Sequence, residues 1–570
     1  MDSIFIRTLV SFTQLEDYRK KILFQLIAEL ITAMSNGHSC LLIEDYLISL
    51  SSEETLSLSI LIDILEKSNI CDFYTSQKIK YNKPLVVIQN TNKNTMLYFN
   101  RYYQYEKFIA IKVNDLSSSS KLNFYDINLE IERLKIKLPI NLPNKNQTEA
   151  IQECAKNKFS IITGGPGTGK TTTIFILILI LLRLYKVPLK IAIIAPTAKA
   201  VFRANESVLN SLSLFSNIIV TDEEKNNINN IQYKTIHKLL GYVGFSSTFK
   251  YNDNNYLDYD IIIVDESSMV SLTLYYHLLL AINDKVTKHV IFLGDTNQLS
   301  SVEEGHVFSD LIKYHLFNKN FLIPNISVSF LEESNRNKED IAVLANSILK
   351  EDINQISQIA NNSNNIIIKE CDLAVLMKDL FVKGGWLLNY VELIKNNNQV
   401  HDLFQYLSQF SILCNKNFGI MGVDNINKVI DSLISDMLDT QDTWYHGRII
   451  VILENNQGLS LVNGDIGICV NEGDGYKIVF KNGKKLSLQL LPRFSLAYAI
   501  TIHKAQGSEY NDVMIVLDDN LNNTLSKELI YTAVTRAKNS VNIYVEKDVL
   551  LKSIQRKLNR YSGLFSFLQI

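Results

Sequence analysis

A glycine-rich loop between two apolar segments constrains the fold of this chain more than any other feature. Residues 164–171 read Gly-Gly-Pro-Gly-Thr-Gly-Lys-Thr, and they follow the apolar run 159–163. Gly-x-x-x-x-Gly-Lys-Thr is the P-loop pattern, in which backbone N–H groups surround phosphates, the lysine contacts the outer phosphates and the hydroxyl binds Mg²⁺. Because residues 172–184 continue as an apolar helical segment, the chain has the strand, loop and helix that this motif requires. A simple glycine-rich turn is therefore disfavoured.

The residue types of the loop fit a nucleoside triphosphate. Side chains would block a close approach of backbone to phosphate, so Gly165, Gly167 and Gly169 leave room for it, while Pro166 stiffens the bend between them. We therefore predict nucleotide contacts from Gly164, Gly165, Pro166, Gly167, Thr168, Gly169, Lys170, Thr171 and Thr172.

Length, charge and cysteine content exclude some classes of protein. The 570 residues are enough for roughly three or four domains. The formal net charge of −2 argues against a uniformly basic surface, so a nucleic acid would have to bind in a local basic groove. The six cysteines lie far apart, without a C-x-x-C pair, which disfavours zinc, iron–sulfur and disulfide frameworks. We expect them to be reduced core residues.

The N-terminus and the apolar segments predict neither export nor membrane insertion. Residues 1–12 carry an acid at position 2 and no small-residue cleavage site of the kind that ends a signal peptide. The most apolar run, residues 174–182, is about half as long as a membrane helix. We therefore expect a cytoplasmic protein that does not contact a membrane.

Apolar periodicity divides the chain into four segments. Residues 1–115 have apolar residues at helical spacing and no catalytic motif, which predicts a separate helical domain. Residues 116–145 are charged, contain two prolines and are typical of a linker. Residues 146–330 and 331–570 alternate apolar β-rich runs with helical patterns, which predicts two α/β domains with parallel sheets. Short strands and glycine-rich turns at about 462–492 predict a small β-barrel inserted into the second.

Two adjacent carboxylates follow a second apolar strand. Asp265 and Glu266 come directly after the run 261–264, and α/β sheets bind ligands at the carboxyl ends of their strands. There Asp265 would bind Mg²⁺ together with Thr171, and Glu266 would polarise water for in-line attack on the γ-phosphate. After a third strand comes Gln298, whose amide is our candidate sensor of the γ-phosphate. These positions favour catalytic carboxylates over a solvated acidic turn.

Two arginines are candidates for stabilising negative charge on a transferred phosphoryl group. Arg336 follows a polar run and Arg536 lies in the segment Tyr-Thr-Ala-Val-Thr-Arg-Ala. Either would reach the site only if a second domain folds across it, and alone each would be an ordinary surface arginine.

A GTPase is an alternative that the sequence disfavours. Residues 337–340, Asn-Lys-Glu-Asp, match the guanine-reading pattern, but they follow a polar run and do not emerge from a buried strand. Asp265 also lacks the glycine three residues on that GTPase switches use. We interpret the match as coincidence.

In their order along the chain, these motifs resemble those of superfamily 1 helicases. Within that superfamily the chain resembles the RecD family, the alpha subunits of exodeoxyribonuclease V. The segments that carry the resemblance are Gln147, the P-loop, 195–200 (APTAKA), 235–241 (TIHKLLG), 264–267 (VDES), 294–298 (GDTNQ), Arg336, 418–423 (FGIMGV), 463–467 (NGDIG), 501–509 (TIHKAQGSE), 528–536 (ELIYTAVTR) and 560–564 (RYSGL). They extend from about residue 140 to the C-terminus, and the match of the N-terminal segment is weaker and positional.

The resemblance implies two RecA-like P-loop motor domains that use ATP and Mg²⁺. It implies a 5′-to-3′ translocase and helicase that acts on single-stranded DNA and at double-stranded DNA ends, in double-strand break repair and recombination. It also implies a heterotrimer with beta and gamma subunits, in which residues 1–115 dock on gamma.

The resemblance also implies residue roles. Gln147 would contact adenine, Lys170 and Thr171 the phosphates and Mg²⁺, and Arg336 and Arg536 the γ-phosphate, beside the catalytic Asp265, Glu266 and Gln298. The DNA path would be lined by Pro196, Thr197, Lys199, Thr235, His237, Lys238, Thr501, His503 and Lys504, whose hydroxyl, ammonium and imidazole groups can donate to phosphate oxygens.

Two other functions compete with this interpretation. A regulatory subunit with a silent motor would be free to lose Lys170, Glu266, Gln298 or Arg536, and all four are present. A nuclease would need an Asp…Glu-x-Lys cluster in a strand context, which the sequence lacks, and the resemblance implies that activity for the beta subunit.

The chain departs from the family's pattern at three places. Ala198 stands where glycine is frequent and Ser267 where alanine is usual, and both changes are small. The segment before Phe418 is shortened, which leaves the conformation of that loop near the DNA path open.

Overall fold

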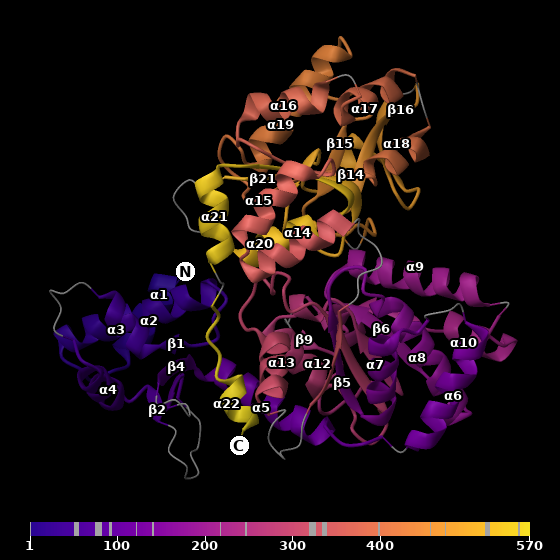
Figure 1. The fold of residues 1–570 in the computed structure, drawn as a ribbon. Coiled ribbons are helices and arrows are strands. Elements are labelled where there is room, and N and C mark those ends of the chain that lie inside the picture. The colour runs from indigo at the N-terminus through magenta and orange to yellow at the C-terminus, as the bar shows by residue number, and fades with distance from the viewer. Residues whose placement is uncertain are drawn as a thin grey trace. The chain divides into compact units, whose positions relative to one another are not determined.

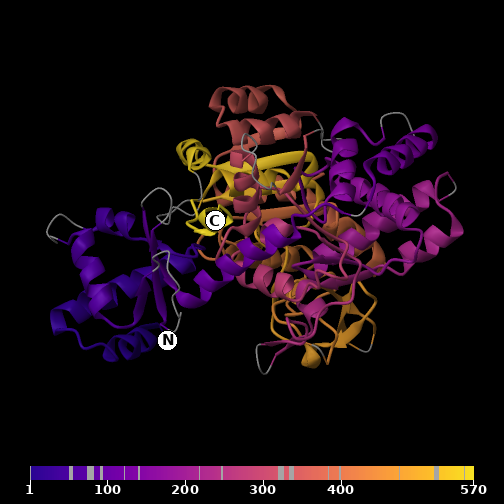
Figure 2. The same ribbon diagram turned by 90° about the horizontal axis from the view of Figure 1, so that it is seen from below.

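A computed structural model describes most of the chain (Figures 1 and 2). It covers all residues except 1, 51–55, 74–82, 90–93, 121, 139–141, 217, 245–247, 319–325, 333–338, 383, 397–398, 457, 474, 519–524, 557–558 and 570. The chain forms two compact units. The first contains Met1–Thr296, Ser300–Glu332 and Asn559–Ile570, and the second contains Asn297–Leu299 and Glu333–Leu558.

The N-terminal segment is a mixed α/β structure, so the prediction of a purely helical domain is wrong. Its helices are α1 (Asp2–Ser11), α2 (Asp17–Ser35), α3 (Ile43–Ser49), α4 (Leu58–Lys67) and α5 (Asn100–Leu116). Four strands, β1 (Leu41–Leu42), β2 (Cys71–Phe73), β3 (Leu85–Gln89) and β4 (Thr95–Phe99), form a sheet in the order β1-β4-β3-β2. Because β3 and β4 are buried nearly throughout, they lack the period-two alternation that identifies a strand. In Figure 2 this segment, coloured indigo, groups its helices around its own small sheet.

The predicted linker is also structured. It contains α6 (Phe124–Lys137), and α7 (Lys145–Lys156) follows it. Ile127, Ile131 and Leu134 recur at i, i+4 and i+7, and they are buried in the same hydrophobic core as the P-loop helix. The charged residues of this segment cover the solvent side of α6 and so concealed its apolar stripe.

The first unit is built on the predicted parallel sheet. Its strands are β5 (Phe159–Gly164), β6 (Ile191–Ala195), β7 (Gln232–Thr235), β10 (Ile261–Val264), β11 (His289–Gly294) and β12 (Ser327–Leu331), in the order β12-β5-β11-β10-β6-β7. Every pairing is parallel. Alternate residues enter two different cores: Ile262 and Val264 face one, and Ile261 and Ile263 face the other. This double burial explains the continuous apolar runs of the sequence.

Helices cover both faces of this sheet. They are α8 (Lys170–Tyr185), α9 (Ala198–Phe215), α10 (Asp222–Asn229), α11 (Ile236–Leu240), α12 (Leu272–Leu280) and α13 (Val307–Asn318), with a short 3-10 turn, η1 (Ser267–Met269) and a hairpin of β8 (Tyr242–Val243) and β9 (Thr248–Phe249). Ten consecutive residues of α8, from Thr173 to Leu182, are buried, which confirms the interpretation of that run as a core helix.

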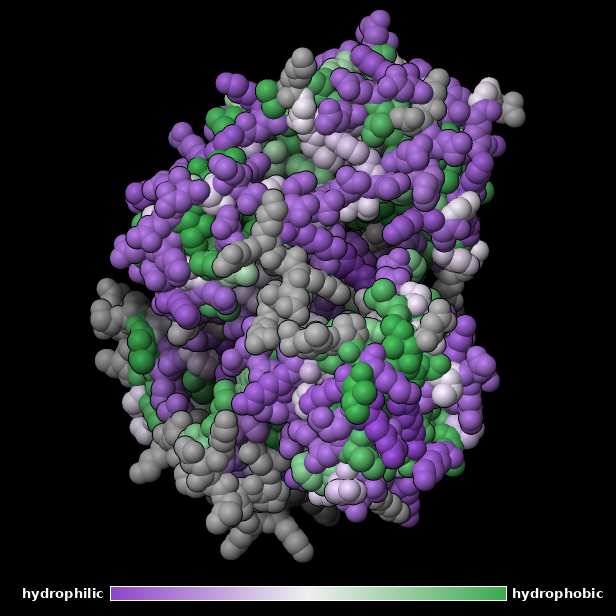
Figure 3. Space-filling model, turned by 45° about the vertical axis from the view of Figure 1, so that its right-hand side comes forward, coloured by the Kyte–Doolittle hydropathy of each residue, from purple (hydrophilic) through white to green (hydrophobic). Residues whose placement is uncertain are grey.

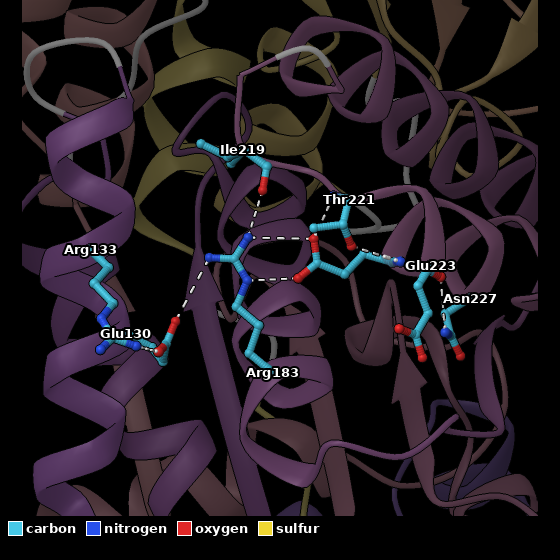
Figure 4. A network of polar contacts seen from close by, with 8 residues as sticks. Glu130, Arg133, Arg183, Ile219, Thr221, Glu223 and Asn227 are labelled. Carbon is cyan, nitrogen blue, oxygen red and sulfur yellow. Dashed lines mark hydrogen bonds and ion pairs between the residues drawn. The ribbon is translucent and has the colours of Figure 1, made fainter.

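A charged network fastens the far end of α8 (Figure 4). Arg183 donates through Nε to Glu224 Oε1 at 2.7 Å and through Nη2 to the Ile219 carbonyl at 2.6 Å. Its Nη1 lies 3.8 Å from Glu130 Oε2 on α6. The helix that carries the P-loop lysine is therefore held by α6 and α10 at its C-terminal end.

The second unit contains a five-stranded parallel sheet of β13 (Ile366–Lys369), β14 (Phe410–Cys414), β20 (Ala499–Thr501), β21 (Tyr510–Leu517) and β22 (Ala537–Val545), in the order β13-β22-β21-β14-β20. Its helices are α14 (Glu339–Lys350), α15 (Ile353–Asn362), α16 (Leu373–Phe381), α17 (Trp386–Lys395), α18 (Val400–Leu407), α19 (Val423–Met437), α20 (Lys527–Val534) and α21 (Lys547–Gln555). The predicted second α/β half is thus present.

An antiparallel sheet interrupts this half where a β-barrel was expected. It contains β15 (Ile449–Ile452), β16 (Ile466–Asn471), β17 (Tyr476–Phe480), β18 (Lys485–Ser487) and β19 (Phe494–Leu496), with a 3-10 turn, η2 (Leu488–Leu490). The order is β18-β17-β16-β15-β19, and among the described residues β18 and β19 do not pair with each other. A closed barrel is therefore not confirmed, and the sheet begins before residue 462.

The C-terminal tail returns to the first unit, where α22 (Leu564–Leu568) lies beside α5 and α13 (Figure 1). The attachment of the tail centres on the buried carboxylate of Glu106 on α5. This carboxylate accepts hydrogen bonds from Ser562 Oγ at 2.8 Å and the Gly563 N–H at 3.0 Å, and from Tyr98 OH at 2.9 Å. Burial raises the pKa of Glu106 to about 7. One side chain therefore joins the N-terminal sheet, α5 and the tail.

Arg560 extends this attachment. Its guanidinium donates to the carbonyls of Ser301 at 2.7 Å and Gly305 at 3.1 Å. Tyr561 donates its N–H to His38 Nδ1 at 2.9 Å, and the two rings stack. The segment Arg-Tyr-Ser-Gly-Leu, which marks the family resemblance, is thus the anchoring part of the tail.

No helix in the described part of the chain is both long enough and apolar enough to cross a membrane.

The packing of the tail predicts that Gly563→Ala destabilises the first unit. A Cβ at this position would lie 2.4 Å from Tyr98 OH, which is itself held by Glu106. We expect a loss of about 1–3 kcal/mol of unfolding free energy, measured by denaturant titration. Gly244→Ala is the matched control, because its Cβ would meet nothing within 4 Å. Equal stability of the two variants would contradict this packing.

Candidate functional site

The glycine loop has the predicted strand, loop and helix geometry. It joins the end of β5 to the first residue of α8, and Gly167 and Gly169 have φ of 79° and 82°. These left-handed conformations favour glycine. A Cβ at Gly169 would also lie 2.4 Å from Gln147 Nε2. The backbone therefore favours glycine at both positions, and Gly169 is the second glycine of the motif.

Lys170 and Thr168 hold the loop in a curled conformation. Lys170 Nζ donates to the carbonyls of Gly164 at 2.6 Å and Gly165 at 3.0 Å, and Thr168 Oγ1 donates to Gly165 O at 2.9 Å. The ammonium group thus lies over the loop. Thr171, in the first turn of α8 with Thr172, is half-buried.

Gln147 supports the loop from α7. Its Oε1 accepts the Asn144 N–H at 3.0 Å, Asn144 Oδ1 accepts the Gln147 N–H at 2.9 Å, and its Nε2 donates to Thr168 O at 3.3 Å. The first two bonds form a capping box at the start of α7. A contact of Gln147 with adenine remains a prediction, because the amide is engaged on both sides here. The spacing Asn-x-x-Gln is the signal from which this role could have been predicted.

Asp265 and Glu266 lie at the carboxyl end of β10, one strand away from the strand that precedes the loop. In the sheet β11 lies between β10 and β5 and pairs with both, Val264 of β10 with Phe292 and Thr163 of β5 with Gly294. Burial, and then the neighbouring Glu266 charge, raise the pKa of Asp265 to about 6, whereas Lys170 lowers it. The strand register thus brings the predicted acidic pair and the P-loop to the same edge of the sheet.

Glu266 adopts an unusual backbone conformation. Its φ is 50°, in the left-handed region, and its N–H donates to Asp265 Oδ1 at 2.8 Å. Non-glycine residues in this region are strained and are found at functional sites. The turn directs the chain from β10 into η1 immediately after the two carboxylates.

The segment of the candidate sensor Gln298 is bonded within the second unit. Gln298 is buried, and the next residue, Leu299, donates its N–H to Thr532 Oγ1 at 3.0 Å and accepts from Gln506 Nε2 at 3.1 Å. This segment follows β11 directly in the chain. A change in its conformation would therefore alter the hydrogen bonds of Leu299 to α20 and to the segment that follows β20.

Of the two candidate arginines, the structure describes Arg536. Arg536 is buried and donates to the carbonyls of Thr532 at 3.1 Å and Ser508 at 3.2 Å. Arg336 lies outside the described residues. A γ-phosphate contact remains a prediction for both.

Three threonines of the predicted DNA path have the same local structure. Thr197, Thr235 and Thr501 each end or follow a parallel strand, and each hydroxyl oxygen accepts the backbone N–H three residues on, at 3.2–3.3 Å. This is the N-terminal capping arrangement of a helical turn. The hydroxyl proton of each threonine is not used in that bond.

The neighbouring side chains are open to solvent. Lys199, His237, Lys238, His503 and Lys504 are exposed, and Pro196 is half-buried. In the first sheet β6 and β7 pair Ala195 with Thr235, so the segments that follow them emerge at one edge. Residues 235–238 and 501–504 both read Thr-Ile-His-Lys, and they also share their capping geometry, so each segment offers an exposed lysine beside a capped turn.

Comparisons with known proteins agree with this arrangement. Residues 147–304 match the AAA domain family model and residues 496–544 match that of the UvrD-like helicase C-terminal domain. The chain is 32% identical over 533 residues to the RecBCD enzyme subunit RecD of Haemophilus influenzae, covering 83% of this chain and 80% of that one. It is 28% identical over 541 residues to the same subunit of Buchnera aphidicola subsp. Acyrthosiphon pisum, covering 88% and 86%.

Among solved structures, Bacteroides Pif1 bound to ssDNA is similar with 16% identity and a TM-score of 0.38, covering 71% of this chain and 93% of that one. This score is low, and the family assignment rests on the sequence relatives.

The bonds of Gln147 predict how two substitutions differ. Gln147→Glu keeps the acceptor for the Asn144 N–H but replaces the donor that faces Thr168 O, whereas Gln147→Ala removes both. A neutral hydrogen bond contributes about 1 kcal/mol, so we expect Gln147→Glu to weaken nucleotide binding roughly fivefold and Gln147→Ala also to lower the melting temperature. Fluorescent nucleotide titration and thermal unfolding measure the two effects.

A comparison of ATP with GTP distinguishes the two possible roles of the Gln147 amide, which are support of the loop and contact with adenine. Support of the loop predicts the same loss of affinity for ATP and GTP. A loss confined to ATP would show that Gln147 acts by contacting adenine.

Proposed function

Because this chain belongs to the RecD family, being 32% identical to a relative of which it covers 80%, we propose that it is an ATP-dependent DNA helicase. It translocates 5′ to 3′ on single-stranded DNA within a helicase–nuclease that unwinds and degrades double-stranded DNA ends in repair and recombination. The observation that supports this most is that the P-loop and the acidic pair leave one parallel sheet at the same edge, after β5 and β10. The alternative, a docking subunit with a silent motor, leaves the retained geometry of this edge unexplained.

The nucleotide chemistry follows from the groups at this edge. Lys170 Nζ lies over the loop and binds the outer phosphates, exchanging its two carbonyl partners for phosphate oxygens. Glu266 accepts a proton from the attacking water, and the neighbouring Asp265 keeps that side of the site negative.

Mg²⁺ fits the same residues. Thr171 and Asp265 offer the oxygen donors that this ion prefers. Partial burial and the neighbouring Glu266 charge both raise the pKa of Asp265, and a divalent cation beside it would offset both effects. When bound, Mg²⁺ neutralises the charge that develops between the β- and γ-phosphates.

Gln298 and the two arginines couple hydrolysis to movement in this proposal. Gln298 senses the γ-phosphate, and the bonds of Leu299 to Thr532 and Gln506 pass the change to the second unit. Arg336 and Arg536 stabilise the γ-phosphate, and Arg536 must first leave its carbonyl partners.

DNA is held through its backbone. The hydroxyl protons of Thr197, Thr235 and Thr501 donate to phosphate oxygens, the exposed lysine side chains beside them add positive charge, and the exposed imidazoles can donate an N–H. Such contacts do not depend on base sequence, as a translocating motor requires.

The partners are the beta and gamma subunits of the same enzyme, and the complex works in the cytoplasm. The N-terminal segment carries exposed apolar side chains, among them Phe12 at 73% and Tyr18 at 70%. Exposed aromatic residues are favoured anchors of protein interfaces. We assign the gamma contact to this surface.

Lys170→Gln is the direct test of the motor. We expect ATP hydrolysis stimulated by single-stranded DNA in the wild type, and a loss of at least a hundredfold in the variant, because the outer phosphates lose their cation. Lys285→Gln, an exposed lysine outside the site, is the control. Hydrolysis that survives Lys170→Gln, or that ignores DNA, would contradict the proposal. Unwinding of duplexes with 5′ or 3′ tails, with and without partner subunits, measures polarity.

Partner docking is tested by the double variant Phe12→Ser and Tyr18→Ser. We expect recovery of the gamma subunit in a co-expression pull-down to fall at least tenfold, the effect of removing interface anchors. Ile136→Ser, which changes an equally exposed apolar residue on α6, should leave recovery unchanged. Undiminished recovery with the double variant would place the interface elsewhere.

A further inference from the structure

The loop that follows β14 presents two apolar side chains to solvent. Phe418 is 78% exposed and Ile420 is 70% exposed, whereas Met421 and Val423, which follow them, are buried. Exposure alone says little, because hydrophobic residues are scattered among polar ones over the face shown in Figure 3. What distinguishes Phe418 is how the backbone holds it.

Backbone hydrogen bonds fix this loop in one conformation. The N–H groups of Gly422, Val423 and Asp424 donate to the carbonyls of Gly419, Lys416 and Asn417 at 3.0–3.1 Å. A Cβ at Gly422 would lie 2.6 Å from backbone atoms of residues 417 and 418, so the turn is closed too tightly for any other residue. The loop therefore cannot easily fold Phe418 back onto the core.

Side chains anchor the base of the loop as well. Asn415 Nδ2 donates to Asp518 O at 3.0 Å, and Asn415 Oδ1 accepts the Asp518 N–H at 3.1 Å. Lys416 Nζ lies 2.7 Å from Asp518 Oδ2 in a partly buried ion pair. The shortened segment before Phe418 is thus a rigid support, which answers the question that the sequence left open.

The loop lies next to a predicted DNA contact of the same unit. β14 and β20 are parallel neighbours, with Cys414 opposite Thr501. Residues after Cys414 and after Thr501 therefore leave the sheet at the same edge, on strands roughly 4.8 Å apart. On the β20 side this edge carries the capping Thr501 and the exposed His503 and Lys504. An exposed aromatic residue and side chains that can donate to phosphates thus follow neighbouring strands at one edge of the sheet.

We propose that Phe418 is a base-stacking residue for single-stranded DNA whose phosphates are held at Thr501, His503 and Lys504. Every base has a π-face, so stacking adds affinity without sequence preference. This inference rests on the proposed function, since it requires the strand to pass this edge. It adds a base contact to an interface otherwise composed of backbone contacts.

The test compares intact and abasic oligonucleotides. Stacking on one base contributes enough that Phe418→Ala should weaken binding of a fluorescent oligothymidylate roughly tenfold in an anisotropy titration. On an oligonucleotide of abasic sites the wild type and Phe418→Ala should bind equally. Tyr125→Ala, which removes an aromatic residue 71% exposed on α6, is the matched control and should bind both ligands as the wild type does.

A second variant tests whether Phe418→Ala weakens DNA binding only because the loop loses its structure. Phe418→Trp retains an aromatic face, so it should bind oligothymidylate as tightly as the wild type, with quenching of its fluorescence by thymine and none by the abasic ligand.

The outcomes separate this inference from the proposed function. If the wild type binds oligothymidylate and Phe418→Ala binds it equally, the stacking role is wrong and the motor proposal stands. If Phe418→Ala loses affinity equally for both ligands, or loses only recovery of partner subunits, Phe418 does not stack on bases. If the wild type binds no single-stranded DNA, the proposed function fails and this inference with it.

Discussion

The parallel register of β5, β11 and β10 is the constraint on which the nucleotide site depends. It pairs Thr163 with Gly294 and Val264 with Phe292, so the glycine loop and the acidic pair leave the sheet at one edge. A shift of one residue would exchange the two faces of β10, moving Ile261 and Ile263 from one core to the other. The register thus places the loop that carries Lys170 and the two carboxylates at the same edge of the sheet.

That edge is electrostatically costly to build. Asp265 is half-buried beside Glu266, whose own backbone occupies the left-handed region, and burial and the Glu266 charge both raise the pKa of Asp265. A sheet selected only for stability would end in neutral residues at a relaxed turn, and stored strain of this kind is typical of sites that bind a charged ligand. The apolar interior of α8 and the network around Arg183 provide the rigid support that such a site needs.

The sequence predicted the parts of the fold where local signals and burial agree. The strand before the P-loop and the helix after it are confirmed, because a P-loop specifies both neighbours. The family resemblance is confirmed by the relatives. The N-terminal sheet was missed, since buried strands such as β3 and β4 show no alternation, and α6 was mistaken for a linker because charged residues dominate its composition.

For the site, the sequence predicted which segments lie at one edge of the sheet, but not the hydrogen bonds that hold them. The P-loop and the acidic pair are brought to one edge as expected, whereas the threonine caps and the brace from Gln147 depend on backbone geometry that no residue pattern fully specifies. Arg336 lies outside the described residues, and the phosphate contact of Arg536 depends on movement of a side chain that here bonds to carbonyls.

The return of the tail to Glu106 has a consequence for how the chain is made. The first unit begins at residue 1 but is completed by Ser562 and Gly563, which supply two of the donors to that buried carboxylate. Domains usually fold as they emerge during synthesis, N-terminal first. Here the first unit includes residues 559–570, so a chain cut short anywhere in the second unit would leave Glu106 without two of its hydrogen-bond donors. Completion of the unit that holds the P-loop therefore requires synthesis of the second unit as well.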